Sequence, residues 1–397
     1  MTKFDVSKQG ALSTEPYVCA SCGNCTLVCP VFRQMKWEPY GSRGKLHVIK
    51  SIVEGREEFD EDIVQKIFMC ALCEHCTEVC TTSINLDRFW EAARRYALEE
   101  GLLPPPAAYA RESVLSFGDP FSMGPSNRMI WSEGLEEIIQ DRINKPAEVA
   151  YFLGCHVGLN AQVHDIARSM VRILDYAGVD FTLLGDLETC CGAPLVWAGD
   201  PDSAPPVNGK NIEAMRKLGV RKIIFSCPSC ITAWQSTYYQ IHGKPVRDEF
   251  ELLTPSQFIA RLNDKGLLDY EEQPMVTVTF HDPCISARRL KTTKEPRDVI
   301  ERIPGVYKVE TVPSEQETRC CGSHALLNRI DPLLASQIAE MRLRDVSVTP
   351  ATMVITECPR CIRAFDLARM TLGYNVELKD ITQIVAGSLK PKDSGGQ

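Results

Sequence analysis

The sequence has no long hydrophobic run, and this limits where the protein can work. A membrane-spanning helix needs about 18 or more consecutive apolar residues. The longest candidates, at 223–225 and 275–280, have only the length of strands. Residues 1–10 also lack the apolar core of a secretory signal. We therefore expect a cytoplasmic protein without a membrane span, either soluble or peripheral to the inner membrane face.

The sequence also has no excess of basic residues. Lys and Arg total 44 against 52 for Asp and Glu, a formal net charge of -8. Because neutralising phosphates requires a basic face, we do not expect nucleic acid as a partner. No Gly-x-Gly-x-x-Gly follows a predicted strand, so any flavin is expected to belong to a partner protein.

Cysteine is the residue that the chain has in abundance, with 18 among 397 residues. Without an export signal, so many clustered cysteines indicate metal binding or catalysis rather than disulfides.

The first eight cysteines form two runs with ferredoxin spacing. The first run is Cys-x2-Cys-x2-Cys-x3-Cys-Pro, and the second repeats it with Thr81 in place of the proline. Three thiolates two residues apart can bind three corners of a cubane, and the fourth cysteine reaches the other cluster. Zinc sites are the alternative, but zinc prefers paired Cys-x2-Cys hooks. The predicted ligands are Cys19, Cys22, Cys25 and Cys80 for one [4Fe–4S] cluster, and Cys70, Cys73, Cys76 and Cys29 for a second.

The cysteine runs lie in a first domain predicted over residues 1–106, which ends at a triple proline. Apolar residues at helical spacing over 46–53, 63–68 and 89–97 predict helices between and after the runs. Residues 107–148 are expected to be a linker of low regularity, because glycine and proline interrupt them. We expect it to cross domain surfaces, with one short helix at 135–139 and no chemistry.

The remaining chain is an internal repeat, with domains predicted over 149–273 and 274–397. Apolar runs precede cysteines in both parts, and each part contains Cys-Cys-Gly. Between the parts, 129 residues separate Cys155 from Cys284 and 131 separate Cys230 from Cys361. Alternating strands and helices predict α/β units with a largely parallel sheet, and the cysteines follow the strands. The repeated cysteines are Cys155, Cys190, Cys191, Cys227 and Cys230, and then Cys284, Cys320, Cys321, Cys358 and Cys361.

Five thiolates in each part exceed the four that a cubane accepts, so one is spare or some bridge two irons. A vicinal disulfide at Cys190-Cys191, or zinc bound by four of the five, are alternatives that the duplication argues against. Gly192 and Gly322 would let the backbone pass close to a cluster. Cys230 and Cys361 lie at predicted helix starts, which stabilise thiolate.

The first domain resembles the α-helical ferredoxin domain of iron–sulfur subunits, and the repeat resembles the cysteine-rich CCG motifs of the heterodisulfide reductase catalytic subunit. Together they are most similar to the fused D-type form, which joins the ferredoxin-like and catalytic subunits in one chain. The resemblance implies an α+β multidomain fold, an α-helical ferredoxin domain followed by two duplicated α/β CCG domains. It also implies four cofactors: two cubane [4Fe–4S] clusters and two non-cubane [4Fe–4S] clusters with bridging thiolates.

The resemblance further implies an oxidoreductase subunit of a multi-subunit complex. Electrons would pass from the cubanes to the non-cubane clusters, which would cleave a disulfide in a cavity lined by Cys191 and Cys321. The expected partners are flavin- and iron–sulfur-containing subunits and a thiol-coenzyme disulfide. Histidine titrates near neutral pH, so His156 and His324 are the predicted proton carriers. The plainer interpretation is that they donate hydrogen bonds to cluster sulfur or are simply packed.

Other roles fit the same cysteines. The chain could be an electron-transfer module of a flavin-based electron-bifurcating complex, such as an acyl-CoA or aromatic acyl-CoA reductase. It could be the iron–sulfur subunit of a glycolate, lactate or glycerol-3-phosphate-type dehydrogenase, with no disulfide substrate. A zinc-stabilised binding scaffold is a third hypothesis. Four arginines, Arg288, Arg289, Arg360 and Arg363, could bind an anionic thiol coenzyme, offset negative clusters or sit in solvent.

Overall fold

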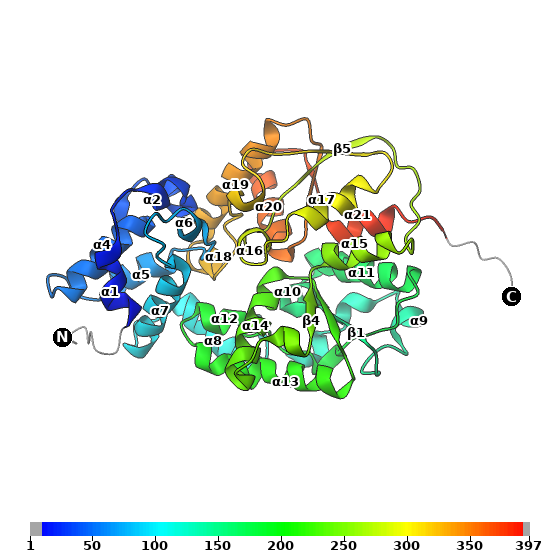
Figure 1. Cartoon of the computed structure of the whole chain (residues 1–397), viewed down its shortest axis with the longest axis horizontal. Coiled ribbons are helices and arrows are strands. Elements are labelled where there is room, and N and C mark those ends of the chain that lie inside the picture. Colours follow the sequence, from blue (N-terminus) through cyan, green and yellow to red (C-terminus); the bar gives the residue numbers. More distant parts are fainter. Residues whose placement is uncertain (1–9, 392–397) are drawn as a thin grey trace.

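Seven α-helices between residues 10 and 104 build a separate unit at one end of the molecule, drawn in blue and cyan in Figure 1. The computed structural model describes residues 10–391. Leu46, Ile49 and Ile52 form the buried face of one helix in this N-terminal unit, and Asn85 caps another by accepting a hydrogen bond from the Arg88 N–H at 3.1 Å. The helices are α1 Ala11–Val18, α2 Asn24–Val28, α3 Pro30–Met35, α4 Ser42–Val53, α5 Glu61–Phe68, α6 His75–Glu78 and α7 Leu86–Glu99.

The linker is more helical than its glycine and proline content predicts. Helix α8 spans Pro105–Phe117 and begins with prolines in its first turn, where their missing N–H groups cost nothing. Gly118, with φ of 73°, ends it in the left-handed region. The short helix predicted near residue 135 is confirmed as α9, Glu136–Ile139.

Two parallel sheets follow, and they have the same strand order. The first sheet runs β2-β1-β3-β4 and the second β6-β5-β7-β8, with every named strand pair parallel. The predicted duplication of α/β units is therefore confirmed. The strands are β1 Val149–Phe152, β2 Phe181–Thr182, β3 Lys222–Phe225 and β4 Glu251–Leu253, then β5 Val276–Phe280, β6 Val306–Val309, β7 Met353–Thr356 and β8 Glu377–Asp380.

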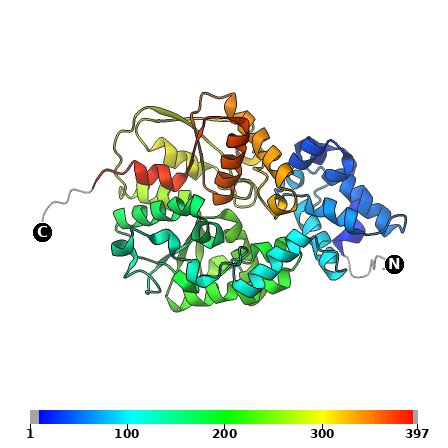
Figure 2. The same cartoon turned by 180° about the vertical axis from the view of Figure 1, so that it is seen from behind.

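Helices cover each sheet and join the two halves of the repeat. Helix α11 packs against α21, and α15 packs against α17, so the halves share one apolar core. Figures 1 and 2 show the halves stacked beside the N-terminal unit. The first half contains α10 Gly154–Leu159, α11 His164–Tyr176, α12 Ala193–Trp197, α13 Ala204–Lys217, α14 Pro228–His242 and α15 Pro255–Asp264. The second contains α16 Cys284–Arg288, α17 Lys294–Glu301, α18 Leu327–Ile330, α19 Pro332–Ser347, α20 Pro359–Leu372 and α21 Ile381–Gly387.

None of the helices within residues 10–391 combines the length and the apolar character needed to cross a membrane.

Candidate metal centres

The first group of cysteines lies at the outer end of the N-terminal unit. Cys19 and Cys22 come from the segment before α2, Cys25 lies in the first turn of α2, and Cys80 comes from the loop after α6. All four line one pocket. Cys22 is exposed whereas Cys25 is buried, so this group has one edge at the molecular surface.

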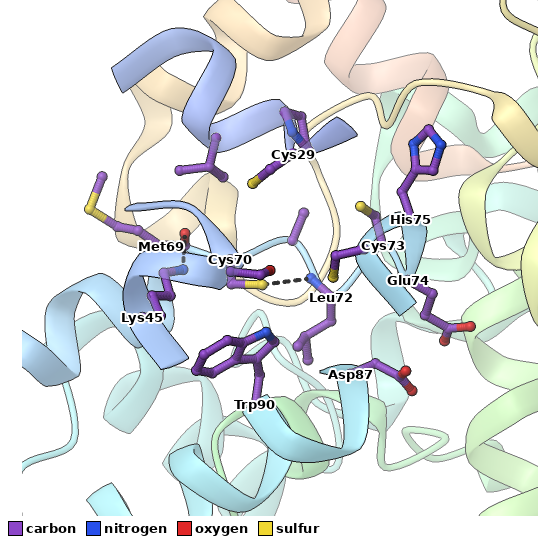
Figure 3. Close-up of a pocket in the computed structure, with 15 residues that line it drawn as sticks. Cys29, Lys45, Met69, Cys70, Leu72, Cys73, Glu74, His75, Asp87 and Trp90 are labelled. Carbon is purple, nitrogen blue, oxygen red and sulfur yellow. Dashed lines mark hydrogen bonds between the residues drawn. The ribbon is translucent and has the colours of Figure 1, made fainter. Parts of the chain in front are cut away.

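The second group lies deeper, between the N-terminal unit and the repeat. Cys29, Cys70, Cys73 and Cys76 line a second pocket. In Figure 3 the labelled Cys29, Cys70 and Cys73 surround one space, with Lys45 and Trp90 on its other side. Lys45 is buried and donates to the Met69 carbonyl at 3.1 Å. Burial lowers the pKa of Lys45, although the neighbouring thiols act in the opposite direction.

The structure thus brings the eight cysteines together in the two sets that their spacing predicts. The last cysteine of each run joins the three leading cysteines of the other run. Each set offers four thiol sulfurs and none of the eight forms a disulfide. This donor set fits a [4Fe–4S] cubane, which takes four thiolates.

The ten cysteines of the repeat are all buried. In each half a backbone N–H of the Cys-Cys-Gly turn donates to sulfur, from Gly192 to Cys190 Sγ at 3.4 Å and from Gly322 to Cys320 Sγ at 3.3 Å. The Cys-Cys-Gly turns of the two halves therefore have the same local geometry.

The two glycines also meet a packing requirement that the sequence analysis did not identify. They have φ of +87° and +81°, and an added Cβ would lie 2.9 Å from Ala204 Cβ at Gly192 and 2.5 Å from Ala335 O at Gly322. Among the described residues, the contact that excludes a side chain is thus with a helix of the same half. A close approach of the backbone to a cluster stays a prediction.

The thiols form a continuous series of contacts from the N-terminal unit through both halves. Cys73 contacts Cys320, and this hydrogen bond is the main reason that the pKa of Cys73 falls to about 6. Within the second half, Cys361 Sγ lies 3.2 Å from Cys321 Sγ, and Cys284 Sγ lies 4.0 Å from Cys320 Sγ. Across the halves, Cys227 contacts Cys358. In the first half, contacts run from Cys227 to Cys230, Cys191, Cys190 and Cys155.

The contact between the halves therefore uses Cys227 and Cys358. Cys191 and Cys321, the pair predicted to line a cavity there, each contact cysteines of their own half. Both are buried, at 5% and 3% exposure.

A linker arginine reaches the first half's cysteines, contrary to the expectation that the linker carries no chemistry. Arg128 Nη2 donates to Cys155 Sγ at 3.3 Å, and Nη1 donates to Glu188 Oε1 at 3.1 Å. Glu188 in turn accepts from the N–H groups of Leu153 and Gly154 at 3.0 and 2.9 Å. Arg128 and Glu188 are 3% and 2% exposed, so this ion pair is buried at the turn that positions Cys155.

In the second half, a histidine lies beside Cys321, which corresponds to Cys191 of the first half. His281, Cys321 and Cys361 place ligand atoms within 4.8 Å of one another, an arrangement able to hold a metal ion. Arg342 Nε donates to His281 Nδ1 at 3.3 Å. The cysteines of the two halves therefore have different polar neighbours.

The two predicted proton carriers occupy different environments. His324 uses both ring nitrogens, with Nδ1 2.7 Å from the Ala71 carbonyl and Nε2 3.1 Å from Ser229 Oγ. Burial lowers its pKa to about 3. His156 lies against the Phe121 ring, and its buried Nδ1 has no hydrogen-bond partner within the described chain. Burial, followed by nearby arginines, lowers the pKa of His156. Proton transfer by these residues stays a prediction.

Arg94, which the sequence analysis did not single out, ties the N-terminal unit to both halves. This fully buried side chain of α7 has no carboxylate partner within residues 10–391, and burial lowers its pKa to about 10. Its guanidinium donates to four carbonyl oxygens at 2.7 to 3.3 Å, those of Phe68, Cys70, Trp197 and Ala325.

Two of the arginines that were candidates for anion binding are also interface residues. Arg288 donates to the Cys73 carbonyl at 3.0 Å, and Arg289 pairs with Glu74 and Asp87. They hold the second half against the second cysteine group and are not available to a ligand.

Comparison with known proteins agrees with this architecture. The "4Fe-4S dicluster domain" family matches residues 15–84, and the "Cysteine-rich domain" (CCG) family matches residues 149–234 and 278–366. The D-type polypeptide of the dihydromethanophenazine:CoB–CoM heterodisulfide reductase of Methanosarcina barkeri is 30% identical, over 94% of this chain and 93% of that protein. The EtfAB:quinone oxidoreductase of Syntrophomonas wolfei is 26% identical, over 75% of this chain and 43% of that protein.

A probable membrane-anchored ferredoxin of Chromohalobacter salexigens is 25% identical, over 94% of this chain and 59% of that protein. Among solved structures, glutamate racemase RacE1 of Bacillus anthracis has a TM-score of 0.31 at 13% identity, over 61% of this chain and 79% of that one, too low to inform the fold.

Proposed function

The chain belongs to the family of CCG-domain iron–sulfur proteins that includes the D-type polypeptide of heterodisulfide reductase, and on this basis we propose that it delivers electrons to a disulfide between its two halves. Membership makes it an iron–sulfur electron-transfer component of an oxidoreductase. The observation that carries the proposal is the series of thiol contacts from Cys73 through Cys320 to Cys358 and Cys227.

The proposed ligands are the four cysteine sets described above. Cys19, Cys22, Cys25 and Cys80 would hold the outer cubane, and Cys29, Cys70, Cys73 and Cys76 the inner one. Each half's five cysteines would hold a non-cubane [4Fe–4S] cluster. When bound, these groups would supply one-electron redox chemistry, so that two of them can together reduce one disulfide to two thiols with two protons.

The chain's own residues define where electrons would enter and leave. The exposed Cys22 puts the outer group at the surface, where a flavin- or iron–sulfur-containing partner protein would donate electrons. Cys73 and Cys320 bring the inner group against the second half. Burial of all ten repeat cysteines excludes bulk water from their sulfur atoms and limits loss of electrons to solvent.

The proposal is tested by a single turnover of the cluster-loaded chain under anaerobic conditions. The chain is reduced, freed of excess reductant, and mixed with a low-molecular-weight disulfide while visible absorption and thiol release are followed. The expected result is reoxidation with two thiols formed for every two electrons lost. Cys358→Ser should abolish this reaction, whereas reduction of the two N-terminal centres should persist. Absence of reoxidation by any disulfide would refute disulfide reduction.

A second candidate is electron transfer without a disulfide substrate, as in a flavoprotein-linked complex. It is favoured by the similarity to an EtfAB:quinone oxidoreductase over 75% of the chain. In the same experiment, reoxidation by a quinone or an oxidised flavoprotein but by no disulfide is the result expected of this candidate.

A further inference from the structure

The two halves of the repeat differ in the residue that stands three positions before their first cysteine. Phe152 precedes Cys155 in the first half, and His281 precedes Cys284 in the second. Phe152 ends β1 and His281 directly follows β5, and both side chains are buried. The two residues therefore occupy equivalent places in the duplicated fold.

Both rings also pack in the same way. The Phe152 ring lies edge-to-face with Trp234 of α14, at 5.5 Å between ring centroids and 73° between planes. The His281 ring lies edge-to-face with Phe365 of α20, at 4.7 Å and 84°. A phenyl ring meets the packing requirement of this place in the first half, so packing does not explain the two nitrogen atoms of His281.

Arg342 determines which ring nitrogen of His281 carries hydrogen. Arg342 Nε donates to His281 Nδ1 at 3.3 Å. The guanidinium is held in place because its other nitrogens donate to Thr311 Oγ1 at 2.7 Å and to the Pro313 carbonyl at 2.9 Å. A guanidinium has donors and no acceptor. His281 Nδ1 must therefore accept with its lone pair, which leaves Nε2 as the nitrogen that carries hydrogen in the neutral ring.

The surroundings keep this ring neutral. Burial is the main cause that lowers the pKa of His281, and the charge of Arg342 acts in the same direction, although a hydrogen bond with Cys321 acts against them. A second hydrogen, on Nδ1, would also point at the Arg342 Nε–H. The ring therefore has one N–H to donate.

The sulfur atoms of the second half are the acceptors within reach of that N–H. Nε2 is buried and has no nitrogen or oxygen acceptor at hydrogen-bond distance within residues 10–391. His281 lies with a ring nitrogen within 4.8 Å of Cys321 Sγ and Cys361 Sγ, and Arg342 already occupies Nδ1. A nitrogen that carries hydrogen has no lone pair for iron. The arrangement therefore favours a hydrogen bond to sulfur over ligation of a metal.

We propose that Arg342 holds His281 as the Nε2–H tautomer and that this N–H donates to Cys321 Sγ. Hydrogen bonds to sulfur are among the factors that set the potential of an iron–sulfur centre, and a donor stabilises the added electron. His281 acts through Cys321 and is thus a positioning residue, without an equivalent at Phe152. The effect on a centre rests on the proposed function, whereas the tautomer and the hydrogen bond do not.

The tautomer is measured on the cluster-loaded chain by nitrogen NMR, with the histidine rings labelled with nitrogen-15. His281→Phe identifies the signals of His281 by their loss, and the first half shows that a phenyl ring fits this place. The expected result is a hydrogen on Nε2 and none on Nδ1. A hydrogen on Nδ1 would overturn the proposal.

The hydrogen bond is measured by pulsed EPR of the reduced chain under anaerobic conditions, and by the potential of the second half's centre. A weak coupling to labelled nitrogen and an exchangeable hydrogen are expected, and both should disappear in His281→Phe. This variant should hold the added electron about tenfold less tightly, which corresponds to about 59 mV for one electron. His281→Gln keeps an N–H donor and should restore most of the potential. A strong nitrogen coupling, typical of an iron ligand, or an unchanged potential contradicts the proposal.

The matched control is His164→Phe, the same substitution at another buried histidine. His164 Nε2 also lacks a hydrogen-bond partner within the described chain. However, burial, Arg168 and Asp165 are what shift the pKa of His164, and no cysteine is among these causes. This variant should keep the potentials of all centres. A shift equal to that of His281→Phe would show a general effect of removing a buried histidine.

The disulfide assay separates this proposal from the proposed function. If the Nε2–H tautomer and the weak coupling are found while no disulfide reoxidises the reduced chain, the role of His281 stands and disulfide reduction fails. If disulfides react normally but the hydrogen lies on Nδ1, disulfide reduction stands and the role of His281 fails. If iron occupies only the N-terminal centres, the proposed function fails, and nitrogen NMR still decides the tautomer that Arg342 imposes.

Discussion

Replacing Arg94 with methionine is expected to lower the free energy of unfolding by about 4 kcal/mol, although its hydrogen bonds go to carbonyl oxygens and not to sulfur. Its guanidinium donates four hydrogen bonds to carbonyls in the N-terminal unit and in both halves. Hydrogen bonds from a charged donor contribute about 1.5 to 3 kcal/mol each, so four give roughly 6 to 12 kcal/mol. The several kcal/mol spent on burying an unpaired guanidinium offset part of this sum.

Arg95→Met is the matched control, because it makes the same substitution one position along α7. Arg95 is exposed and pairs with Glu99 at 3.2 Å and Asp202 at 2.8 Å. Exposed ion pairs contribute about 1 kcal/mol or less. Urea unfolding of the cluster-loaded chain under anaerobic conditions, followed by tryptophan fluorescence and visible absorption, measures both variants. If the two substitutions cost the same, Arg94 does not join the three parts as argued.

Further predictions concern a buried ion pair, a buried carboxyl and a tight contact. Arg128→Gln should lower the free energy of unfolding in urea by about 3 to 5 kcal/mol, because it leaves Glu188 buried and unpaired. Adding Glu188→Gln should recover most of this loss, and a double variant no more stable than Arg128→Gln alone would contradict the pairing. Burial raises the pKa of Asp380 from 3.8 to about 7, so the folded state keeps a proton that the unfolded state releases. This carboxyl should therefore contribute a fall in stability of up to about 4 kcal/mol as pH rises from about 4 to 7, and Asp380→Asn should remove that contribution. In Gly199→Ala, the added Cβ would lie 2.3 Å from the backbone oxygen of Arg94 in α7, so trypsin should cut the linker faster. The control is Gly219→Ala, where φ is also positive but no atom lies within 4 Å of the added Cβ.

The cysteine sets and the repeat could be predicted because their signals are local. Ferredoxin spacing indicates that the fourth cysteine of each run joins the three leading cysteines of the other run. In the repeat, short apolar segments before the cysteines predict the strands that position them. The structure brings Cys80 and Cys29 to the opposite groups, as that spacing predicts. The order of the two sheets repeats as the sequence repeat requires.

The docking of the units could not be predicted, because it depends on contacts between distant segments. Nothing near Arg128 in the sequence marks it as a neighbour of Cys155, since glycine and proline around it suggest an irregular linker. Arg94 did carry a signal. It shares a helical face with the buried Trp90, Ala93 and Ala97, and an arginine on an apolar face must find acceptors inside the protein.

The differences between the halves bear on the direction of electron transfer. The backbone plan was duplicated, but the charges around the sulfur atoms were not. Cys155 in the first half accepts a hydrogen bond from Arg128, and Arg360 acts on Cys227, whereas the second half has His281 beside Cys321. Net charge and hydrogen bonds to sulfur set the potential of an iron–sulfur site, and positive charge stabilises an added electron. On the proposed function, electrons that reach the second half through Cys73 and Cys320 would therefore be drawn to the first half, away from the N-terminal unit.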